Sequence, residues 1–309
     1  MAKKTNSWLA AGVVLLIIAG FIWFMRPPKN IDPTVSHGTL ERIPTIESQF
    51  LPPRDVSVWL PDGYKIGDSC DVLYMHDGQM LFDAATTWNN QEWRVDEMMD
   101  TLIKDGKIHP CIVVAINNTR DRLNEYYPDK TWKYLDDNKL KKTDTLKLKG
   151  DAYLKFIVEE LKPYIDEHYK PLTSREHTFM MGSSMGGLIS LYALCEYPQV
   201  FGGVACLSSH LSMAHLPNGL DNEAWATGFR DYVRQQLPEA NGSLIYMDHG
   251  TKDFDADYGP YQVALDSVIT ALGWDTSHYQ SLVFNGVGHN ENSWAKRLDK
   301  PLIFLLGKE

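Results

Sequence analysis

The stretch that decides the fold is HTFMMGSSMGGLISLYALCEY, residues 177–197. An apolar run at 177–182 predicts a buried strand, and the run at 187–197 predicts a helix. Between them lies a G-x-S-x-G sequence at residues 182–186. Such a sequence between a strand and a helix is typical of a sharp turn that lifts a serine hydroxyl above the edge of a sheet. The segment therefore predicts that Ser184 is a nucleophile.

The glycines around Ser184 support this interpretation. Gly182 and Gly186 are expected to leave room where a side chain would clash, and Gly187 to allow the helix to pack closely. The N-terminus of that helix would favour the negative charge that develops at the serine. Ser183 has the wrong glycine spacing for the same role.

Strands and helices alternate along the rest of the chain. Apolar runs predict strands at 54–64, 71–78, 111–118, 177–182, 201–209, 243–250 and 278–286. Helical spacing predicts helices at 92–106, 152–169, 187–197, 224–237, 261–273 and 292–298. Apolar strands separated by helices predict an α/β fold with a mostly parallel central sheet and helices on both faces.

Composition narrows the class of protein. The chain has 309 residues, enough to bury a substantial core, and a net charge of −10. That charge argues against a nucleic-acid partner, because binding to phosphates needs a basic face. The four cysteines, Cys70, Cys111, Cys195 and Cys206, show no metal-ligand spacing and are expected to be buried free thiols.

The N-terminal segment differs from the remainder. Residues 8–25 run for 18 positions without a charge, flanked by lysines before and by Arg26 after. This length is at the lower edge for a transmembrane helix. Bulky residues directly before Arg26 disfavour cleavage, so residues 1–29 are expected to be an uncleaved membrane anchor, with a cleaved signal as the alternative. The positive charges on the two sides of the segment nearly balance, so its orientation stays open; the very short N-terminal tail favours export, and the following domain is expected outside the cytoplasm, in the periplasm or outside the cell.

Two other segments are irregular. Proline-rich residues 30–53 are interpreted as a linker and lead-in to a catalytic domain at 54–309. Residues 128–150 have mixed charge and little periodicity, which fits either a lid over a site or a solvated surface loop.

A serine needs a base, and His289 is the best candidate among ten histidines. It lies in a glycine-rich loop, FNGVGHNENSW, between the last predicted strand and the last predicted helix. The acid that orients it should lie between Ser184 and His289 in the chain. The segment YMDHGTKDFDADY offers four aspartates, of which Asp253 is preferred because it follows the strand, and Asp255 is the reserve.

The oxyanion of an acyl-transfer reaction needs two backbone N–H donors. Met185, directly after the serine, is expected to supply one of them. Gly78 or Gln79, in YMHDGQMLF, is expected to supply the other, although this segment is equally consistent with an ordinary Asp-Gly turn.

With these residues assembled, the chain resembles the esterase D-like branch of the α/β-hydrolases. That branch includes S-formylglutathione hydrolases, feruloyl and acetylxylan esterases, siderophore esterases and mycolyltransferases. The resemblance covers residues 54 to 307 and rests on RDVSVWLPDGY, YMHDGQMLFD, RLNEYYP, LKPYIDEHY, REHTFMMGSSMGGLISLYA and GVGHNENSWAKRL. It implies the same triad, and it places Arg120 and Glu125 either at the site or in a structural ion pair.

The expected function is hydrolysis of carboxylic esters through an acyl-enzyme, with no metal or organic cofactor. Carbohydrate-linked or feruloyl esters are mildly preferred as substrates. Acyl transfer to an alcohol, siderophore ester hydrolysis and a non-catalytic binding scaffold are the alternatives. Trp88, Trp93, Tyr126 and Tyr127 could form an aromatic wall for a sugar or phenol, or belong to the core.

Overall fold

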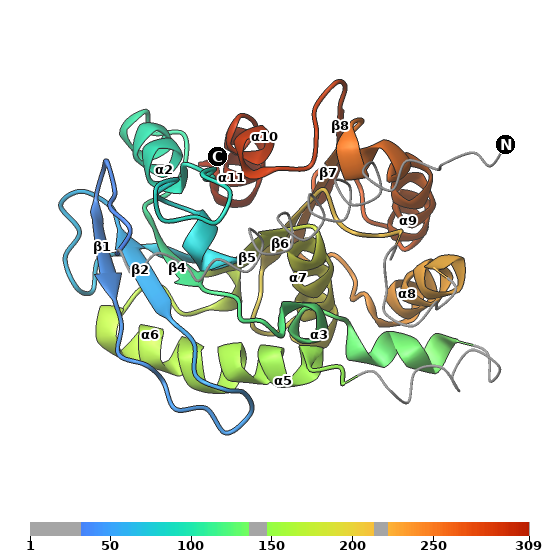
Figure 1. Cartoon of the computed structure of the whole chain (residues 1–309), viewed down its shortest axis with the longest axis horizontal. Coiled ribbons are helices and arrows are strands. Elements are labelled where there is room, and N and C mark those ends of the chain that lie inside the picture. The colour runs from blue at the N-terminus through green and yellow to red at the C-terminus, as the bar shows by residue number, and fades with distance from the viewer. Residues whose placement is uncertain (1–31, 136–146, 213–221, 309) are drawn as a thin grey trace, which may run out of the picture.

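The computed structural model describes residues 32–135, 147–212 and 222–308. Its centre is an eight-stranded sheet with the order β1-β2-β4-β3-β5-β6-β7-β8 (Figure 1). The strands are β1 (Thr39–Arg42), β2 (Val56–Leu60), β3 (Asp71–His76), β4 (Cys111–Ile116), β5 (Thr178–Ser183), β6 (Gly203–Leu207), β7 (Leu244–Gly250) and β8 (Tyr279–Phe284). The six strands from β4 to β8 in this order are parallel, whereas β1 and β2 are antiparallel to their neighbours. The prediction of a mostly parallel sheet is confirmed.

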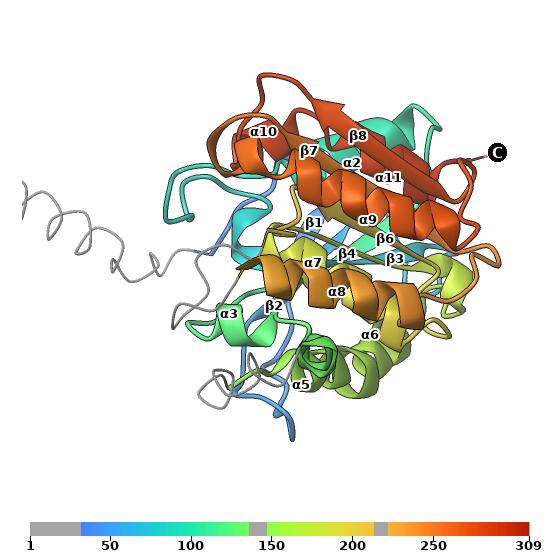
Figure 2. The ribbon, with the colours of Figure 1, turned by 90° about the vertical axis from the view of Figure 1, so that its right-hand side faces the viewer.

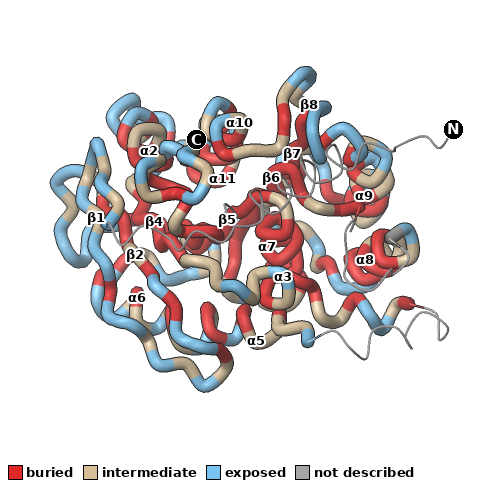
Figure 3. Tube along the Cα trace, in the orientation of Figure 1, coloured by how far each residue is buried: buried red, intermediate tan, exposed pale blue. Residues whose placement is uncertain are grey.

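The inner strands β2 to β7 are mostly apolar because both faces of the sheet are covered there. In β3, Val72 and Tyr74 belong to one hydrophobic cluster, and Leu73 and Met75 belong to the other. Successive side chains of a strand point to opposite faces, so each strand contributes to two cores. The inner strands are accordingly buried, whereas the edge strands β1 and β8 and the outer sides of the helices are partly exposed (Figure 3).

Helices form a layer on each face of the sheet, as Figure 2 shows. One layer contains α2 (Val95–Lys104), α10 (Glu291–Ala295) and α11 (Asp299–Leu306). The other contains α5 (Gly150–Lys155), the π-helical η3 (Phe156–Leu161), α6 (Lys162–Tyr169), α7 (Met185–Glu196), α8 (Asn222–Gln236) and α9 (Gly259–Ala271). The short helices η1 (Gly78–Met80), α3 (Arg122–Glu125), η2 (Asp129–Tyr134), η4 (Arg175–His177) and η6 (Asp253–Asp257) lie in the connections.

Two predicted irregular segments contain regular structure. Residues 39–42, within the expected linker, form β1, which pairs with β2 from Thr39↔Leu60 to Arg42↔Ser57. Within the segment at 128–150, η2 packs against α8, and α5 begins at Gly150. The remaining part of that segment, residues 136–146, lies outside the described residues.

The expected membrane anchor at residues 1–29 also lies outside the described residues. Within the ranges that the structure does describe, no helix combines the length and apolar character needed to cross a bilayer.

Backbone strain is concentrated where the parallel strands end. Asp77 follows β3, Ser184 follows β5, Ser208 follows β6 and Asp253 lies three residues after β7; all four have φ between 42° and 58°. Non-glycine residues in this region cost about 1–3 kcal/mol each and cluster at functional sites. The carboxyl edge of the sheet is therefore where a site is expected.

Candidate active site

Ser184 occupies the turn between β5 and α7. Its φ of 58° and ψ of −121° are unusual for a residue with a side chain, as expected of a strained strand-to-helix turn. The turn is fixed by hydrogen bonds from Ser184 N to Leu207 O at 2.9 Å and from His210 N to Ser184 O at 3.2 Å. From Thr178 to Cys195, Ser184 is the one residue that is not buried. The turn thus presents this side chain at the end of the sheet.

The glycines around the serine are not equivalent. A Cβ at Gly182 would lie 2.8 Å from His76 Cδ2 and 2.9 Å from the backbone of Gly186, and one at Gly187 would lie 2.2 Å from Ser209 Oγ. A Cβ at Gly186 would meet its nearest neighbour, His76 Cβ, at 3.4 Å. The first glycine of the motif and Gly187 are required by close packing. The expectation that a side chain at Gly186 would clash is wrong.

His289 follows β8 and is held by a buried carboxylate. Its Nδ1 lies 2.6 Å from Asp255 Oδ1, and the Asp255 side chain is fully buried whereas that of His289 is 11% exposed. Burial opposes ionisation of Asp255, but the hydrogen bonds from His289 and Ser208 bring the pKa of its carboxyl below the usual value. The ionised carboxylate of Asp255 therefore holds Nδ1 of His289. Within the described part of the chain, no side chain forms a hydrogen bond with Nε2, the other nitrogen of this imidazole.

The structure gives the position beside His289 to Asp255, the reserve candidate, and not to the preferred Asp253. Asp253 is exposed and begins η6 with a φ of 55°, and its carboxylate packs near Gly288. The turn of η6 brings the chain back towards the sheet two residues later. Asp255 Oδ2 then accepts hydrogen bonds from Gly250 N and Ser208 Oγ, both at 2.6 Å.

A second group of side chains holds the Asp255 carboxylate in place, and the sequence analysis did not identify this group. Ser208 Oγ, which donates to Asp255, accepts hydrogen bonds from Trp294 Nε1 at 3.0 Å and Arg297 Nη2 at 2.9 Å. Arg297 is itself held by Asp248, with contacts of 2.9 and 3.0 Å to the two carboxylate oxygens. Asp248 lies inside β7, as expected, and it supports Asp255 indirectly, by holding Arg297 against Ser208.

Tyr258 connects the serine and the histidine. Its hydroxyl lies 2.7 Å from His210 Nδ1. Burial raises the pKa of this phenol, and the nearby Ser184 side chain opposes that shift. The Tyr258 ring lies against the edge of the His289 ring, with centroids 5.8 Å apart and planes at 89°. Trp294 and Phe254 contact the same imidazole at 5.1 and 5.6 Å. The structure therefore brings Ser184, His289 and Asp255 to one edge of the sheet.

Of the predicted oxyanion donors, Gly78 and Gln79 follow β3, which lies on the opposite side of β5 in the sheet from β7, the strand that precedes Tyr258, and Met185 directly follows Ser184. Gly78 and Gln79 begin η1, and Met185 begins α7. The first N–H groups of a helix have no acceptor within it, so they are free to face a ligand. A Cβ at Gly78 would lie 2.6 Å from Ala115 C, and Gln79 Oε1 accepts a hydrogen bond from Asn118 N at 3.1 Å.

Asp77 holds this turn in place. Its carboxylate lies 2.6 Å from Arg122 Nε, 2.8 Å from Arg122 Nη2 and 2.5 Å from Asn118 Nδ2. Burial alone would raise the pKa of Asp77, but the charge and hydrogen bonds of Arg122 lower it. Next to it, burial lowers the pKa of His76 to about 3, so this histidine stays neutral and supports the turn.

Glu125 belongs to an ion pair, but its partner is Arg54 and not Arg120. The two contacts between the Arg54 guanidinium and the Glu125 carboxylate are both 2.9 Å, and both side chains are fully buried. A buried bidentate pair of this kind needs both partners, because either charge alone would be uncompensated. Glu125 is therefore part of a buried structural ion pair with Arg54.

The suggested aromatic wall does not form as a unit. Trp93 packs on Trp294 with ring centroids 5.2 Å apart, and Tyr127 packs edge-on against Trp225 at 5.1 Å. Trp93, Tyr126 and Tyr127 are buried, whereas Trp88 is 57% exposed. Three of the four are core residues.

The cysteines are all buried free thiols, as expected. Among the described residues, His37, Asp62 and Asp100 form the one group whose potential metal-ligand atoms lie within 4.8 Å of one another. Lys104 Nζ contacts both of those carboxylates, at 3.4 and 2.9 Å, and compensates their charge.

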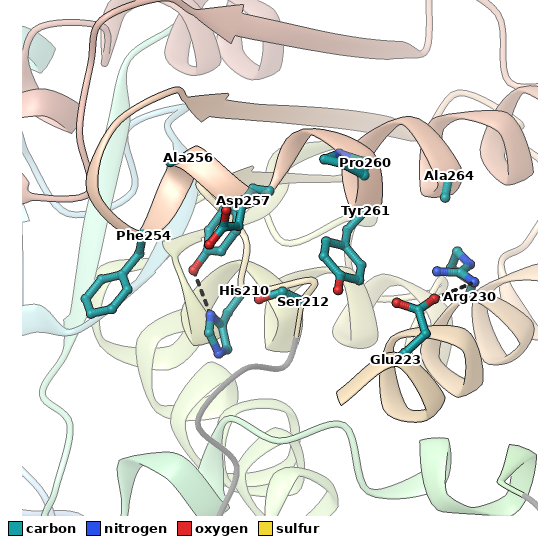
Figure 4. A pocket seen from close by; sticks show the side chains of 11 residues that line it. His210, Ser212, Glu223, Arg230, Phe254, Ala256, Asp257, Pro260, Tyr261 and Ala264 are labelled. Carbon is teal, nitrogen blue, oxygen red and sulfur yellow. Dashed lines mark hydrogen bonds and ion pairs between the residues drawn. The ribbon is translucent and has the colours of Figure 1, made fainter. Parts of the chain in front are cut away.

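A cavity of about 600 Å³ adjoins the site between η6, α8 and α9. Figure 4 shows His210 and Phe254 near one end of it and Arg230 with Glu223 at the other. Arg230 Nη2 lies 3.8 Å from Glu223 Oε1. Tyr258 also lines the cavity, so the space begins at the residue that contacts Ser184.

Ser184 follows β5, Asp255 follows β7 and His289 follows β8, so the three residues occur along the chain in the order serine, aspartate, histidine. The chain belongs to the esterase family described as "Putative esterase", whose family model matches residues 49–305.

Solved structures show the same fold. A ferulic acid esterase superposes with a TM-score of 0.64 at 21% identity, over 87% of this chain and 97% of that one. A ferulic acid esterase from Anaeromyces mucronatus, solved with ferulic acid, has a TM-score of 0.61 at 18% identity, over 92% and 94%. The enterobactin esterase of Shigella flexneri, solved with enterobactin, has a TM-score of 0.64 at 18% identity. That match covers 91% of this chain and 62% of the Shigella enzyme. No curated protein matches the chain.

Proposed function

We propose that this protein is a serine esterase that hydrolyses carboxylic esters through an acyl-enzyme on Ser184. The observation that carries the proposal is the 2.6 Å contact between His289 and the buried Asp255, at the same edge of the sheet as a serine on a strained turn. A serine hydroxyl is a weak nucleophile unless a base removes its proton. His289 is the base in this mechanism, and Asp255 orients it and stabilises its cationic form.

The reaction has two steps. Ser184 Oγ attacks the ester carbonyl while its proton moves to His289, and the N–H groups of Met185 and of Gly78 or Gln79 bind the oxyanion. The bond between the carbonyl carbon and the alcohol oxygen then breaks, and His289 returns the proton to the alcohol. Water repeats the sequence on the acyl-enzyme and releases the acid.

The first substrates to test are feruloyl and other carbohydrate-linked esters. Two of the structurally similar enzymes are ferulic acid esterases, and the cavity beside Tyr258 has room for a substantial group. A panel of feruloyl, acetyl and siderophore esters would rank these substrates by kcat/KM.

The experiment that tests the function compares the wild type with Ser184→Ala and Ser183→Ala on p-nitrophenyl acetate. Ser184→Ala should lose essentially all turnover, whereas Ser183→Ala, which changes a buried neighbour, should keep the nucleophile. Circular dichroism must show that both variants are folded. Full turnover in a folded Ser184→Ala protein would refute the proposal.

A further inference from the structure

Tyr258 has a position that the triad does not explain. Tyr258 is 2% exposed, yet its hydroxyl is near Ser184, the one residue from Thr178 to Cys195 that is not buried. Its backbone is fixed by a hydrogen bond from Tyr258 N to Asp255 O at 3.1 Å, so the turn that positions the acid also positions the phenol. His210 Nδ1 holds the hydroxyl from the other side at 2.7 Å.

During the reaction, the alcohol oxygen of a bound ester must come close to both Ser184 and His289, the two residues beside the Tyr258 phenol. That oxygen is bonded to the carbon that Ser184 attacks, and it must also come within reach of the free nitrogen of His289 to receive a proton. Tyr258 is near both groups, because its hydroxyl is close to the Ser184 side chain and its ring lies edge-on to the imidazole, with centroids 5.8 Å apart. The proposed oxyanion donors lie at the ends of β3 and β5, whereas Tyr258 follows β7, beyond β6 in the sheet order. An ester oriented by those donors therefore directs its alcohol oxygen towards Tyr258.

We propose that Tyr258 is a further catalytic residue, which donates a hydrogen bond to the alcohol oxygen of the ester as that oxygen leaves, with His210 as its positioning residue. This inference rests on the proposed function. When the tetrahedral intermediate collapses, the electron pair of the breaking C–O bond remains on the alcohol oxygen. The proton that neutralises this oxygen comes from His289, and Tyr258 keeps its own proton. Burial raises the pKa of Tyr258, so the phenol remains a donor at neutral pH.

The proposal also assigns the cavity. Because the cavity begins at Tyr258 and continues to Arg230 and Glu223, the alcohol half of the ester would occupy it (Figure 4). At its far end the cavity presents a guanidinium and a carboxylate that compensate each other. Because the carboxylate of Asp257 also lines the cavity, the charged side chains there favour an uncharged polar alcohol over an anion.

The test measures kcat/KM of Tyr258→Phe on a series of acetate esters that differ only in the alcohol. A hydrogen bond to the leaving oxygen matters most when that oxygen is basic. We expect a loss of about 10- to 100-fold for ethyl acetate, a smaller loss for trifluoroethyl acetate and almost none for p-nitrophenyl acetate. His210→Gln should give the same trend with smaller losses. The matched control is Tyr64→Phe, which removes a hydroxyl that donates to Tyr169 O at 2.6 Å at the opposite edge of the sheet.

A loss in Tyr258→Phe that is equal for all esters, or no loss for any of them, would overturn the proposal, because a merely structural role does not depend on the leaving group. An equal loss across the series in His210→Gln would overturn the role given to His210. These results remain distinguishable from failure of the proposed function, which would appear as activity in Ser184→Ala.

Discussion

Asp255 Oδ1 lies 2.6 Å from His289 Nδ1, and the other oxygen of the same carboxylate is held by Ser208 and Gly250. This arrangement fixes the orientation of the Asp255 carboxylate. One of its oxygens faces the imidazole, and the other accepts hydrogen bonds from Ser208 Oγ and Gly250 N. A carboxylate so placed selects one tautomer of His289 and keeps its second nitrogen directed away from the acid.

The first prediction concerns the identity of the acid. Asp255→Asn should lower kcat by about 10⁴-fold, because an amide in this position cannot stabilise the imidazolium and favours the wrong tautomer. Asp253→Asn is the matched control, since asparagine also tolerates the positive φ at this exposed position. It should change kcat by less than about threefold. The reverse order of the two losses would mean that η6 rearranges to use Asp253.

The second prediction compares the two glycines of the serine motif. Gly182→Ala should destabilise the protein by about 1–3 kcal/mol, because the added methyl group would overlap His76 and the backbone of Gly186. Gly186→Ala meets only contacts of 3.4 Å or more, and alanine favours a helix, so it should be neutral or slightly stabilising. Denaturant unfolding of both variants measures the difference. Equal destabilisation would show that the packing argument at this turn is incorrect.

The third prediction concerns Asp129 and pH. Burial, together with the nearby Asp151, raises the pKa of Asp129 to about 7, although Gly150 N donates a hydrogen bond to it at 2.7 Å. Its pKa in the folded state is above its unfolded value near 3.9, so folding favours the protonated form. Stability from this group is therefore present at low pH and is lost as the pH rises through 7.

Asp129→Asn removes that ionisation and keeps an acceptor for Gly150. Its Tm should exceed that of the wild type at pH 8 by about 2–4 °C, the change that roughly 1 kcal/mol causes in a domain of this size. The two proteins should converge as the pH falls to about 4, the unfolded pKa of the carboxyl, and below. A Tm difference that does not vary with pH would contradict the shifted ionisation.

The fourth prediction concerns the cavity. Ala264, on α9, lines the cavity away from Ser184, so Ala264→Phe should fill part of it without touching the triad. Because the alcohol half of the ester is proposed to lie there, kcat/KM for esters of bulky alcohols should fall by about tenfold. Ethyl acetate should be hydrolysed at the wild-type rate. Loss of both activities, or of neither, would mean that the alcohol lies elsewhere.

Much of the architecture could be predicted from sequence because the parallel strands are apolar on both faces. Each strand predicted between residues 54 and 286 is present, and the serine turn lies where the G-x-S-x-G sequence placed it. The sequence analysis missed the strand β1 because this strand lacks the apolar pattern of the inner strands. It lies at the edge of the sheet, its residues are mostly exposed, and TLER has no apolar alternation that would distinguish it from a linker.

The choice between Asp253 and Asp255 could not be made from sequence because it depends on one turn. Both residues follow β7 within five positions, and the path of η6 decides which of them faces the sheet. The positions of Ser208, Tyr258 and Arg297 beside the site could not be predicted from the sequence either. They depend on contacts between segments up to 89 residues apart, and none of them forms a sequence motif with its partners.

The most direct test of the central claim is to identify the residue that reacts as the nucleophile. The protein is treated with a fluorophosphonate probe, digested and examined by mass spectrometry, in parallel with Asp255→Asn. We predict a single adduct on Ser184 in the wild type, formed far more slowly in Asp255→Asn. An adduct on another residue, or no adduct on active enzyme, would contradict the account.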